Sequence, residues 1–435
     1  MADDDGPPRG RVPDLAPETR AILAGRASNQ NALAPILWAT SAFTYDSVAE
    51  GRALATGVAP ERFYSRYGNP TVNAFEEAIA DLEGAETCRA FASGMGAISA
   101  VVLGLCSKGD HVVAQRQLYA GTQLLLQTAC PRFGIDVTFV DGTRPGAFAE
   151  AVQPGRTMLV VAETPANPYL DLVDLDELGA IEGPMTMVDS TFATPLGQQP
   201  IAHGVDLVVH SATKAIAGHN DATIGVVSGS AELLGWLWSF AVLHGANASP
   251  FDALNAHRGV RTLAVRLAQQ SATAQQLAES LEGCPLVDRL SYPGLESHPQ
   301  HDLARRQMRL MGGLVTFDVA GGLDAGARFV EATRVARAAS TLGGPETLVT
   351  HPASTTHVNL TAEELADVGI GPGTVRVSCG LEHTDDVVAE TPANPYLDLV
   401  DLDELGALEG PMTMVDSTFA TPLGQQPPGH TEAQA

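Results

Sequence analysis

The sequence has few basic residues and few aromatic residues for its length. Among 435 residues, Lys and Arg total 25 against 51 Asp and Glu, which gives a formal net charge of −26. Aromatic residues make up 5% of the chain, and no basic run interleaved with aromatics occurs. Because binding to a nucleic-acid backbone depends on concentrated positive charge, this composition argues against a nucleic-acid partner.

Long hydrophobic runs and paired cysteines are also missing. The most apolar stretch, Gly96–Cys106, is too short to span a membrane. The first residues are acidic and show no signal-peptide core. The five cysteines are scattered without CxxC spacing, and His210, His219, His351 and His357 show no metal-ligand spacing. We therefore expect a cytoplasmic protein with reduced thiols, no membrane association and no bound metal.

Between about residue 68 and residue 230, short apolar runs alternate with helical patterns. The predicted strands are residues 111–113, 137–140, 158–162, 185–188, 207–209 and 224–227. Strands that are separated by helices or turns indicate a mostly parallel sheet that is covered on both faces. Ligands bind such sheets at the carboxyl ends of the strands, so polar motifs at those ends are candidate site residues.

The pattern divides the chain into an arm, two domains and a tail. Residues 1–65 are predicted to be an N-terminal arm, and residues 1 to about 30, rich in Pro, Gly and charge, read as a flexible start. Residues 66–260 are predicted to form the large α/β domain. Residues 261–386, which begin with a helical pattern over Arg261–Leu281, predict a smaller α+β domain. The expected fold class is therefore α/β, with a mostly parallel central sheet and a smaller C-terminal domain.

The C-terminal tail copies an internal segment. Val160–Pro200 recurs at Val387–Pro427, and Ile181, replaced by leucine in the copy, is the only difference. Structural repeats diverge and occur in arrays of several units. A lone, nearly identical copy indicates instead a recent duplication, a fusion scar or an assembly error. We predict that residues 387–435 are an aberrant tail, which replaced part of a closing helix that begins at Thr384.

One lysine stands close to the end of a buried strand. The run Asp206–His210 leads into Ser211, Thr213 and Lys214, and a turn of small residues follows. An amine in this position loses hydration, which lowers its pKa and makes it nucleophilic toward carbonyl groups. Binding of pyridoxal phosphate through a Schiff base is the commonest use of such a lysine. Most lysines are solvated surface charges, so the neighbouring motifs must support this interpretation.

Several polar residues suit the pyridine ring and the phosphate of that cofactor. Asp189 ends a predicted strand, where a buried carboxylate would keep the pyridine nitrogen protonated, although strand-end aspartates also cap turns. The small-residue helix that opens at Gly94 and Met95 offers amide groups and a positive dipole end to a phosphate. The hydroxyl groups of Ser211 and Thr213 lie beside the lysine in sequence and suit the same phosphate.

Further residues suit the ring and an anionic substrate. Tyr64 and Arg66 lie in a loop before a helix, and the arginine fork matches a phosphate. Tyr119 either stacks on the cofactor ring and moves protons or is a core aromatic near a helix start. Arg376 lies within an apolar strand, and a buried arginine requires an anion such as the carboxylate of an amino acid.

Seven segments carry a resemblance to a known family. They are YSRYGNPT (64–71), ASGM (92–95), ETPANP (163–168), VDSTFATP (188–195), HSATKAIAGHND (210–221), THPASTTH (350–357) and VRVSCGLE (375–382). In this order they resemble the Cys/Met-metabolism family of pyridoxal phosphate enzymes. It includes cystathionine γ-lyase, cystathionine γ-synthase, methionine γ-lyase and the O-acylhomoserine sulfhydrylases. The resemblance runs from about Asn29 to Asp386 and implies the aminotransferase-like fold type I.

The resemblance implies a role for each cofactor-binding residue. Lys214 is then the Schiff-base lysine and main proton shuttle, and Asp189 pairs with the pyridine nitrogen. Tyr119 stacks on the ring and assists proton transfer, and Asn167 contacts the phenolic oxygen. The residues that hold the phosphate are Gly94, Met95, Ser211 and Thr213.

The resemblance also implies an oligomer and a substrate site. Tyr64 and Arg66 would reach the phosphate of a neighbouring subunit, which implies at least a homodimer and usually a homotetramer. Arg376 would bind the substrate carboxylate, and Thr341 would lie at the substrate as well. The expected partner is a small amino acid.

The reaction implied is removal of a proton by Lys214 followed by loss of a γ-substituent, which yields a 2-oxo acid, ammonia and a thiol in a carbon–sulfur γ-lyase. A γ-synthase or sulfhydrylase uses the same residues and adds a thiol instead. Gly121 stands where methionine γ-lyases often carry cysteine, and Ser340 where many cystathionine γ-lyases have glutamate. We favour the lyase over the synthase.

A non-catalytic homologue damaged by the tail is a third interpretation, which the presence of all the catalytic residues argues against.

Removal of the tail is expected to leave cofactor binding intact. The copy repeats Asn167 and Asp189 as Asn394 and Asp416, but it contains no counterpart of Lys214 and so no second site. Chains that end after Asp386 or Glu390 should keep the visible absorption of the cofactor when purified. Strong loss of this absorption in both truncated chains would contradict the prediction.

Overall fold

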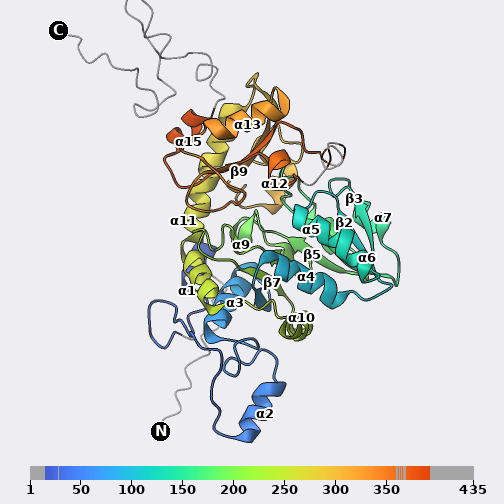
Figure 1. Cartoon of the computed structure of the whole chain (residues 1–435), viewed down its shortest axis with the longest axis vertical. Coiled ribbons are helices and arrows are strands. Elements are labelled where there is room, and N and C mark those ends of the chain that lie inside the picture. Colours follow the sequence, from blue (N-terminus) through green and yellow to red (C-terminus); the bar gives the residue numbers. More distant parts are fainter. Residues whose placement is uncertain are drawn as a thin grey trace, which may run out of the picture. The chain divides into compact units, whose positions relative to one another are not determined.

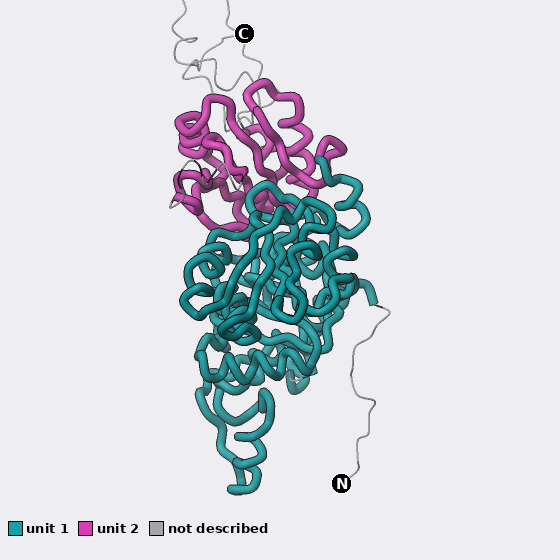
Figure 2. Tube along the Cα trace, turned by 90° about the vertical axis from the view of Figure 1, so that its right-hand side faces the viewer, with its two compact units in different colours: residues 1–268, 299–312 teal, residues 269–298, 313–435 magenta. Residues whose placement is uncertain are grey.

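The computed structural model describes residues 15–27, 29–358, 361, 363, 365 and 369–391. The described chain forms two compact units, drawn in teal and magenta in Figure 2. The first unit contains residues up to 268 together with 299–312, and the second contains residues 269–298 and those from 313 onward. Most of the predicted tail, from residue 392 onward, lies outside the described residues.

The first unit is built on a seven-stranded sheet with the order β1-β7-β6-β5-β4-β2-β3 (Figure 1). Its strands are β1 (Thr87–Phe91), β2 (His111–Gln115), β3 (Asp136–Val140), β4 (Thr157–Glu163), β5 (Met185–Asp189), β6 (Leu207–His210) and β7 (Gly225–Gly229). Only β7 runs antiparallel to its neighbours, so the predicted mostly parallel sheet is confirmed. The apolar pattern missed β1, because Arg89 interrupts this short strand.

Helices pack on both faces of this sheet. The described α-helices of the unit, besides the long α11, are α1 (Pro17–Leu23), α2 (Val48–Thr56), α3 (Pro70–Glu83), α4 (Gly94–Leu105), α5 (Ala120–Leu124), α6 (Cys130–Arg132), α7 (Ala147–Ala151), α8 (Leu175–Gly179), α9 (Thr194–Gly197), α10 (Ala231–His244) and α12 (His301–Gln307). Successive side chains of a strand point to opposite faces. Val226 therefore packs in the core with α3, whereas Val227 packs in the core with α4 and α10.

The sequence of α3 sets both its start and its buried face. The Asn69 side chain caps the helix by accepting a hydrogen bond from the amide of Thr71 at 2.9 Å, and Pro70 occupies the first turn. The predicted apolar face is buried, as its four residues show: Val72, Phe75, Ile79 and Leu82. The helix proposed from this periodicity is confirmed.

The flexible start expected for residues 1 to about 30 is wrong for Pro17–Leu23, which form helix α1, and residues 1–14 and 28 lie outside the described residues. Helix α1 packs on α3, where Ala21 is buried and the Nε of Arg20 lies 2.8 Å from the Oδ2 of Asp81. The buried alanine and the ion pair stabilise this helix through contacts with α3. The content of Pro, Gly and charged residues could not predict these contacts.

The second unit contains a five-stranded sheet with the order β10-β11-β12-β9-β8, which confirms the expected smaller α+β domain. Its elements are β8 (Val287–Ser291), β9 (Leu314–Val319), α13 (Gly322–Ala332), β10 (Arg337–Ala338), β11 (Leu348–Thr350), β12 (Thr374–Ser378) and α15 (Thr384–Glu390). The long helix α11 (Pro250–Leu281) starts well before the predicted Arg261 and contributes residues to both units. Among the described residues, no helix combines the length and apolarity needed to cross a membrane.

Helix α15 ties the start of the duplicated sequence into the second unit. Val387 is buried, and the Glu390 carboxylate accepts hydrogen bonds from the amides of Arg334, Val335 and Ala336. The tetrapeptide Val-Val-Ala-Glu at 387–390 is therefore part of the fold, even though it is identical to the start of the copied segment.

We expect Glu390→Ala to lower the free energy of unfolding by about 1–3 kcal/mol, because three main-chain N–H groups lose their charged acceptor. Urea unfolding followed by circular dichroism would measure the change. The matched control is Glu331→Ala, which removes an exposed glutamate of the same unit and should change stability by less than about 0.5 kcal/mol. Equal effects of the two substitutions would contradict a role for Glu390.

Candidate active site

The carboxyl ends of four parallel strands gather most of the predicted site residues in the first unit. Tyr119 follows β2, Asn167 follows β4, Asp189 ends β5, and Lys214 lies in the turn after β6. Strands β4 and β5 are paired so that Glu163 faces Asp189. Because neighbouring parallel strands end at the same edge, these residues lie along one side of the sheet.

The N-terminus of α4 meets the turn after β6. The Ser93 hydroxyl caps the helix by accepting a hydrogen bond from the amide of Gly96 at 3.0 Å. A Cβ at Gly94 would lie only 2.7 Å from the Cβ of Ser211, so the approach requires glycine. The first amides of a helix have no partner within the helix and suit an anion. This junction, which we call the α4 cradle (Gly94, Met95 and Ser211), fits the phosphate of pyridoxal phosphate.

Asp189 is linked to the cradle through one threonine. The amide and the hydroxyl of Thr191 donate to the Oδ1 of Asp189, and the amide of Ser211 donates to the Thr191 hydroxyl at 2.8 Å. Burial raises the pKa of the Asp189 carboxyl, although the hydrogen bonds from Thr191 oppose the shift. A carboxyl in this environment favours a cationic partner, and a protonated ring nitrogen is such a partner. The environment of Asp189 therefore fits the cofactor ring.

Lys214 lies in a tight turn rather than on the strand itself. Strand β6 ends at His210, and the amide of Lys214 donates to the carbonyl of Ser211 at 3.0 Å. The Lys214 side chain is half-buried. The Thr213 hydroxyl accepts a hydrogen bond from the amide of Ile224 at 2.9 Å, which connects this turn to the residue before β7.

Met95 and Tyr119 both lie close to Gly121. A Cβ at Gly121 would lie 2.6 Å from the ring of Tyr119 and 3.1 Å from the sulfur of Met95. The Tyr119 side chain is 44% exposed, so its ring has open space on one side. This exposure argues against the alternative of a core aromatic.

Glu163 is a residue that the search for site residues missed. Its buried carboxylate accepts a hydrogen bond from the amide of Tyr119 at 2.7 Å and another from the amide of Asn167 at 2.8 Å. Gln115, at the end of β2, binds the main chain of Glu163 through its side-chain amide. The carboxylate of Glu163 thus holds the main chain of two candidate cofactor residues. The feature of the sequence that could have identified Glu163 is its position as the first residue of the ETPANP segment.

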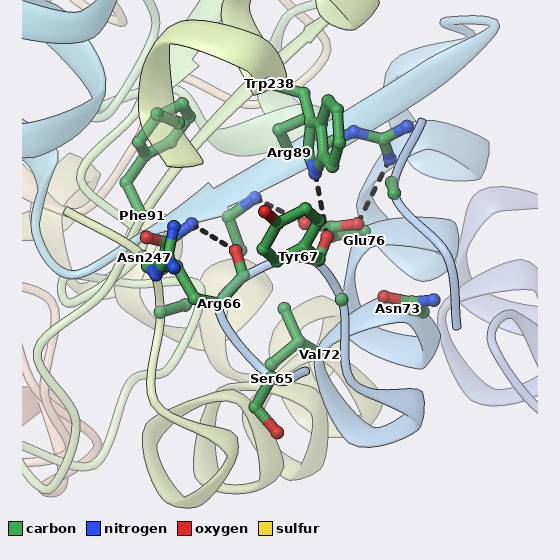
Figure 3. Close-up of a pocket in the computed structure, with 15 residues that line it drawn as sticks. Ser65, Arg66, Tyr67, Val72, Asn73, Glu76, Arg89, Phe91, Trp238 and Asn247 are labelled. Atoms are coloured by element: carbon green, nitrogen blue, oxygen red, sulfur yellow. Dashed lines mark hydrogen bonds and ion pairs between the residues drawn. The ribbon is translucent and has the colours of Figure 1, made fainter. Parts of the chain in front are cut away.

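Tyr64 and Arg66 are not brought to the α4 cradle by contacts within the described chain. The guanidinium of Arg66 donates to the carbonyl of Val242 on α10 at 2.8 Å, and it lies 5.4 Å from the ring of Tyr64. Figure 3 shows the pocket that Arg66 lines together with Tyr67, Trp238 and other residues. Lys214 is not among the residues that line this pocket.

The two predicted substrate residues belong to the second unit. Arg376 is buried in β12 between β9 and β11. Burial, with the nearby charge of Arg376, lowers the pKa of His357 to about 4. Thr341 lies in a loop that is attached to β12, because the amide of Gly343 donates to the hydroxyl of Ser378 at 2.9 Å.

No group of His, Cys, Asp and Glu within the described residues is arranged to hold a metal ion. The chemistry of the strand ends instead resembles that of one class of enzymes. A parallel sheet with a lysine, a buried aspartate and a helix N-terminus at its edge is typical of fold type I pyridoxal phosphate enzymes.

Comparison with known proteins agrees with this class. The family described as Cys/Met metabolism PLP-dependent enzyme matches residues 18–390. The chain belongs to this family, which confirms the resemblance seen in its motifs, and it is an enzyme that uses pyridoxal phosphate. The match ends at Glu390, the last residue of α15.

Relatives of established name cover most of the chain. An O-succinylhomoserine sulfhydrylase of Pseudomonas aeruginosa is 43% identical over 377 residues, or 86% of this chain and 93% of the relative. An L-methionine gamma-lyase of Porphyromonas gingivalis is 41% identical over 379 residues, or 86% of this chain and 95% of the relative. A solved structure of cystathionine gamma synthase from Xanthomonas oryzae pv. oryzae, in complex with aminoacrylate and cysteine, shows 36% identity and a TM-score of 0.81, covering 87% of this chain and 97% of that one.

We expect Glu163→Gln to weaken cofactor binding about tenfold. The amide NH₂ would face one of the two main-chain N–H groups that the carboxylate now accepts, and that donor would be left without a partner. Titration of the apoprotein with pyridoxal phosphate, followed by absorbance, would measure the dissociation constant. Glu77→Gln, an exposed glutamate on α3, is the matched control and should bind as the wild type does. An unchanged dissociation constant in Glu163→Gln would refute the positioning role.

Proposed function

We propose that this enzyme is a carbon–sulfur γ-lyase of the cystathionine or methionine type, which converts a sulfur amino acid and water into a 2-oxo acid, ammonia and a thiol. The main support is the combination of Lys214, Asp189 and the α4 cradle at one sheet edge, in a chain 41% identical to an L-methionine gamma-lyase. Elimination at Cγ requires proton removal at two neighbouring carbons. The leaving group needs a proton as well, and Lys214 and Tyr119 would supply the groups for these proton transfers.

Each proposed role uses a group of this chain. The cofactor, when bound, supplies an electron sink for the charge that develops on the substrate. Lys214 would hold the cofactor through its amine and then remove the proton from the substrate Cα. Asp189 would face the ring nitrogen, and Asn167 the phenolic oxygen. Tyr119 would stack on the ring and carry a proton to or from the leaving group.

The phosphate would be held by the main-chain amides of Gly94 and Met95 and by the hydroxyl groups of Ser211 and Thr213. The contact between Gly94 and Ser211 supports this assignment, because it brings the helix amides and a hydroxyl to one place. Negative charge at the start of a helix is also stabilised by the helix dipole.

The proposed assembly is a cytoplasmic homo-oligomer, most simply a tetramer built from two dimers. Tyr64 is 44% exposed and Arg66 is also exposed in the single chain, which supports their reaching the phosphate of a neighbouring subunit. We assign residues 1–65 to the arm, 66–260 to cofactor binding and 261–386 to the substrate side. In this last part, Arg376 and Thr341 would bind the substrate.

A second candidate is γ-replacement by a cystathionine γ-synthase or an O-acylhomoserine sulfhydrylase. It is favoured by the 43% identity to an O-succinylhomoserine sulfhydrylase. It also gains support from Gly121, where methionine γ-lyases often carry cysteine. A side chain at this position would require the Tyr119 ring to move, since an added Cβ would lie 2.6 Å from it.

The test is the release of 2-oxobutanoate from L-cystathionine, L-methionine and O-acylhomoserine, each with and without added thiol. Release from a sulfur amino acid without thiol would establish the lyase. Reaction of the O-acyl ester alone, diverted by thiol into a thioether, would establish γ-replacement and overturn the first proposal. Silence toward all three substrates by protein that holds the cofactor would count against both.

Lys214→Ala should reduce the rate with the best substrate at least about a thousandfold, because the group that moves the Cα proton is lost. Initial rates on the purified variant, supplied with excess cofactor, would measure the effect. The chain contains only one other lysine, the exposed Lys108. Lys108→Ala therefore tests the loss of the only other lysine side chain, and this variant should keep wild-type activity. Retained activity in Lys214→Ala would refute the assignment.

A further inference from the structure

A buried arginine lies directly behind the turn that carries Lys214. Arg266, on α11 and in the first unit, is 3% exposed. Its guanidinium donates to the main-chain carbonyls of Ala215 at 2.7 Å, Ile216 at 3.3 Å and Gly259 at 2.7 Å. Its Nε donates to the hydroxyl of Thr262 at 3.0 Å. Every acceptor that Arg266 has in the described chain is therefore an uncharged oxygen.

Burial of this guanidinium without a carboxylate beside it costs free energy, which indicates that the arginine has a specific role at this position. A buried charge loses several kcal/mol of hydration, and an opposite charge is the usual compensation. Here carbonyl dipoles provide the compensation, and burial lowers the pKa of Arg266 to about 10, which still leaves it charged at neutral pH. Two of the three carbonyls belong to Ala215 and Ile216, the residues that immediately follow Lys214.

The guanidinium and the turn are closely packed at two glycines. A Cβ at Gly218 would collide with the Nη1 of Arg266, and Gly218 has a φ of +66°, which favours glycine. A Cβ at Gly259 would collide with the carbonyl oxygen of Ala217. Helix α11 therefore touches the main chain of the turn directly, and Arg266 fills the space between them.

The turn itself has few side chains that could anchor it. Ala215, Ala217 and Gly218 are too small to hold the main chain by packing alone, and Ile216, which is buried in the core, is the one larger side chain among the four residues after Lys214. The Lys214 carbonyl accepts a hydrogen bond from the amide of Gly218 at 2.8 Å, which closes the turn internally. The carbonyls of the next two residues are held from outside by Arg266.

We propose that Arg266 is a positioning residue for Lys214: its guanidinium fixes the carbonyls of Ala215 and Ile216 and thereby keeps the lysine amine directed at the cofactor. This inference rests on the proposed role of Lys214 as the residue that binds pyridoxal phosphate. A reacting group that is held in place gains a large effective concentration, so looser attachment of the turn should weaken the covalent link more than the other cofactor contacts.

The experiment measures how much of the bound cofactor is linked to Lys214. Holoenzyme is divided: one part is used for total pyridoxal phosphate by alkaline release, and the other is treated with sodium borohydride, which fixes lysine-linked cofactor permanently. Peptide mass spectrometry then counts fixed cofactor at each lysine. Lys108 and Lys214 are the only lysines of the chain and fall in different peptides, so their fixed cofactor is counted separately from each other and from any at the N-terminal amine.

The variants are Arg266→Met, Arg266→Lys and the matched control Arg258→Met, which removes an exposed arginine from the same helix. We expect the ratio of Lys214-linked to unlinked bound cofactor to fall about tenfold in Arg266→Met, since hydrogen bonds from a charged donor are lost. Arg266→Lys should fall between this variant and the wild type, because an ammonium lacks the planar fork that reaches several carbonyls. Arg258→Met should match the wild type.

The outcomes separate the inference from the proposed function. A lower melting temperature in Arg266→Met with an unchanged linked ratio would make Arg266 a purely structural residue and overturn the inference. If Arg266→Met does not fold, Arg266→Lys decides in the same way by its ratio. Wild-type enzyme whose bound cofactor is not fixed on Lys214 would overturn the proposed site itself, whatever the variants show.

Discussion

Parallel pairing of β2, β4, β5 and β6 is the constraint on which the rest of the site depends. It places the residues that follow four strands along one edge, even though those residues are far apart in sequence. The antiparallel β7 completes the arrangement, because its first residue, Gly225, lies against Ser93 and Gly94 at the start of α4. The helix terminus, the aspartate and the lysine turn therefore belong to one rigid framework.

Buried charges next to this edge are satisfied mainly by the main chain. Glu163 accepts hydrogen bonds from two amides, and Arg266 donates to three carbonyls. A buried charge that is hydrogen-bonded to main-chain groups can hold a loop in position without an oppositely charged side chain beside it. Glu390, the counterpart of Glu163 in the duplicated sequence, likewise binds main-chain amides, but in the second unit and at the end of a helix.

Much of the framework was predictable from local patterns. The helix face of α3 followed from periodicity, and the strands β2 to β7 from continuous apolar runs. In all of these strands but the edge strand β3, burial on both faces demands apolar residues at nearly every position. Helix α1 and strand β1 escaped, since their stability comes from contacts with α3 and β7 that are distant in sequence. Of the polar residues at the sheet edge, Lys214 and Asp189 stood out because each follows an apolar strand. Arg266 gave no such signal, since an arginine in a helix is usually a solvated surface residue.

The sequence by itself determined the class of sheet, the family through its ordered motifs, and the residue types available for chemistry. These depend on neighbours along the chain, because periodicity, strand-end position and short sequence motifs are all local. The tertiary structure alone decided that Gly94 touches Ser211, that one carboxylate holds Tyr119 and Asn167, and that a guanidinium clasps the turn after Lys214. Except for the hydrogen bond between Asn167 and Glu163, each of these contacts joins segments separated by at least 40 residues. A hydrogen bond from a side chain to a distant main-chain group leaves no residue-type pattern in a sequence.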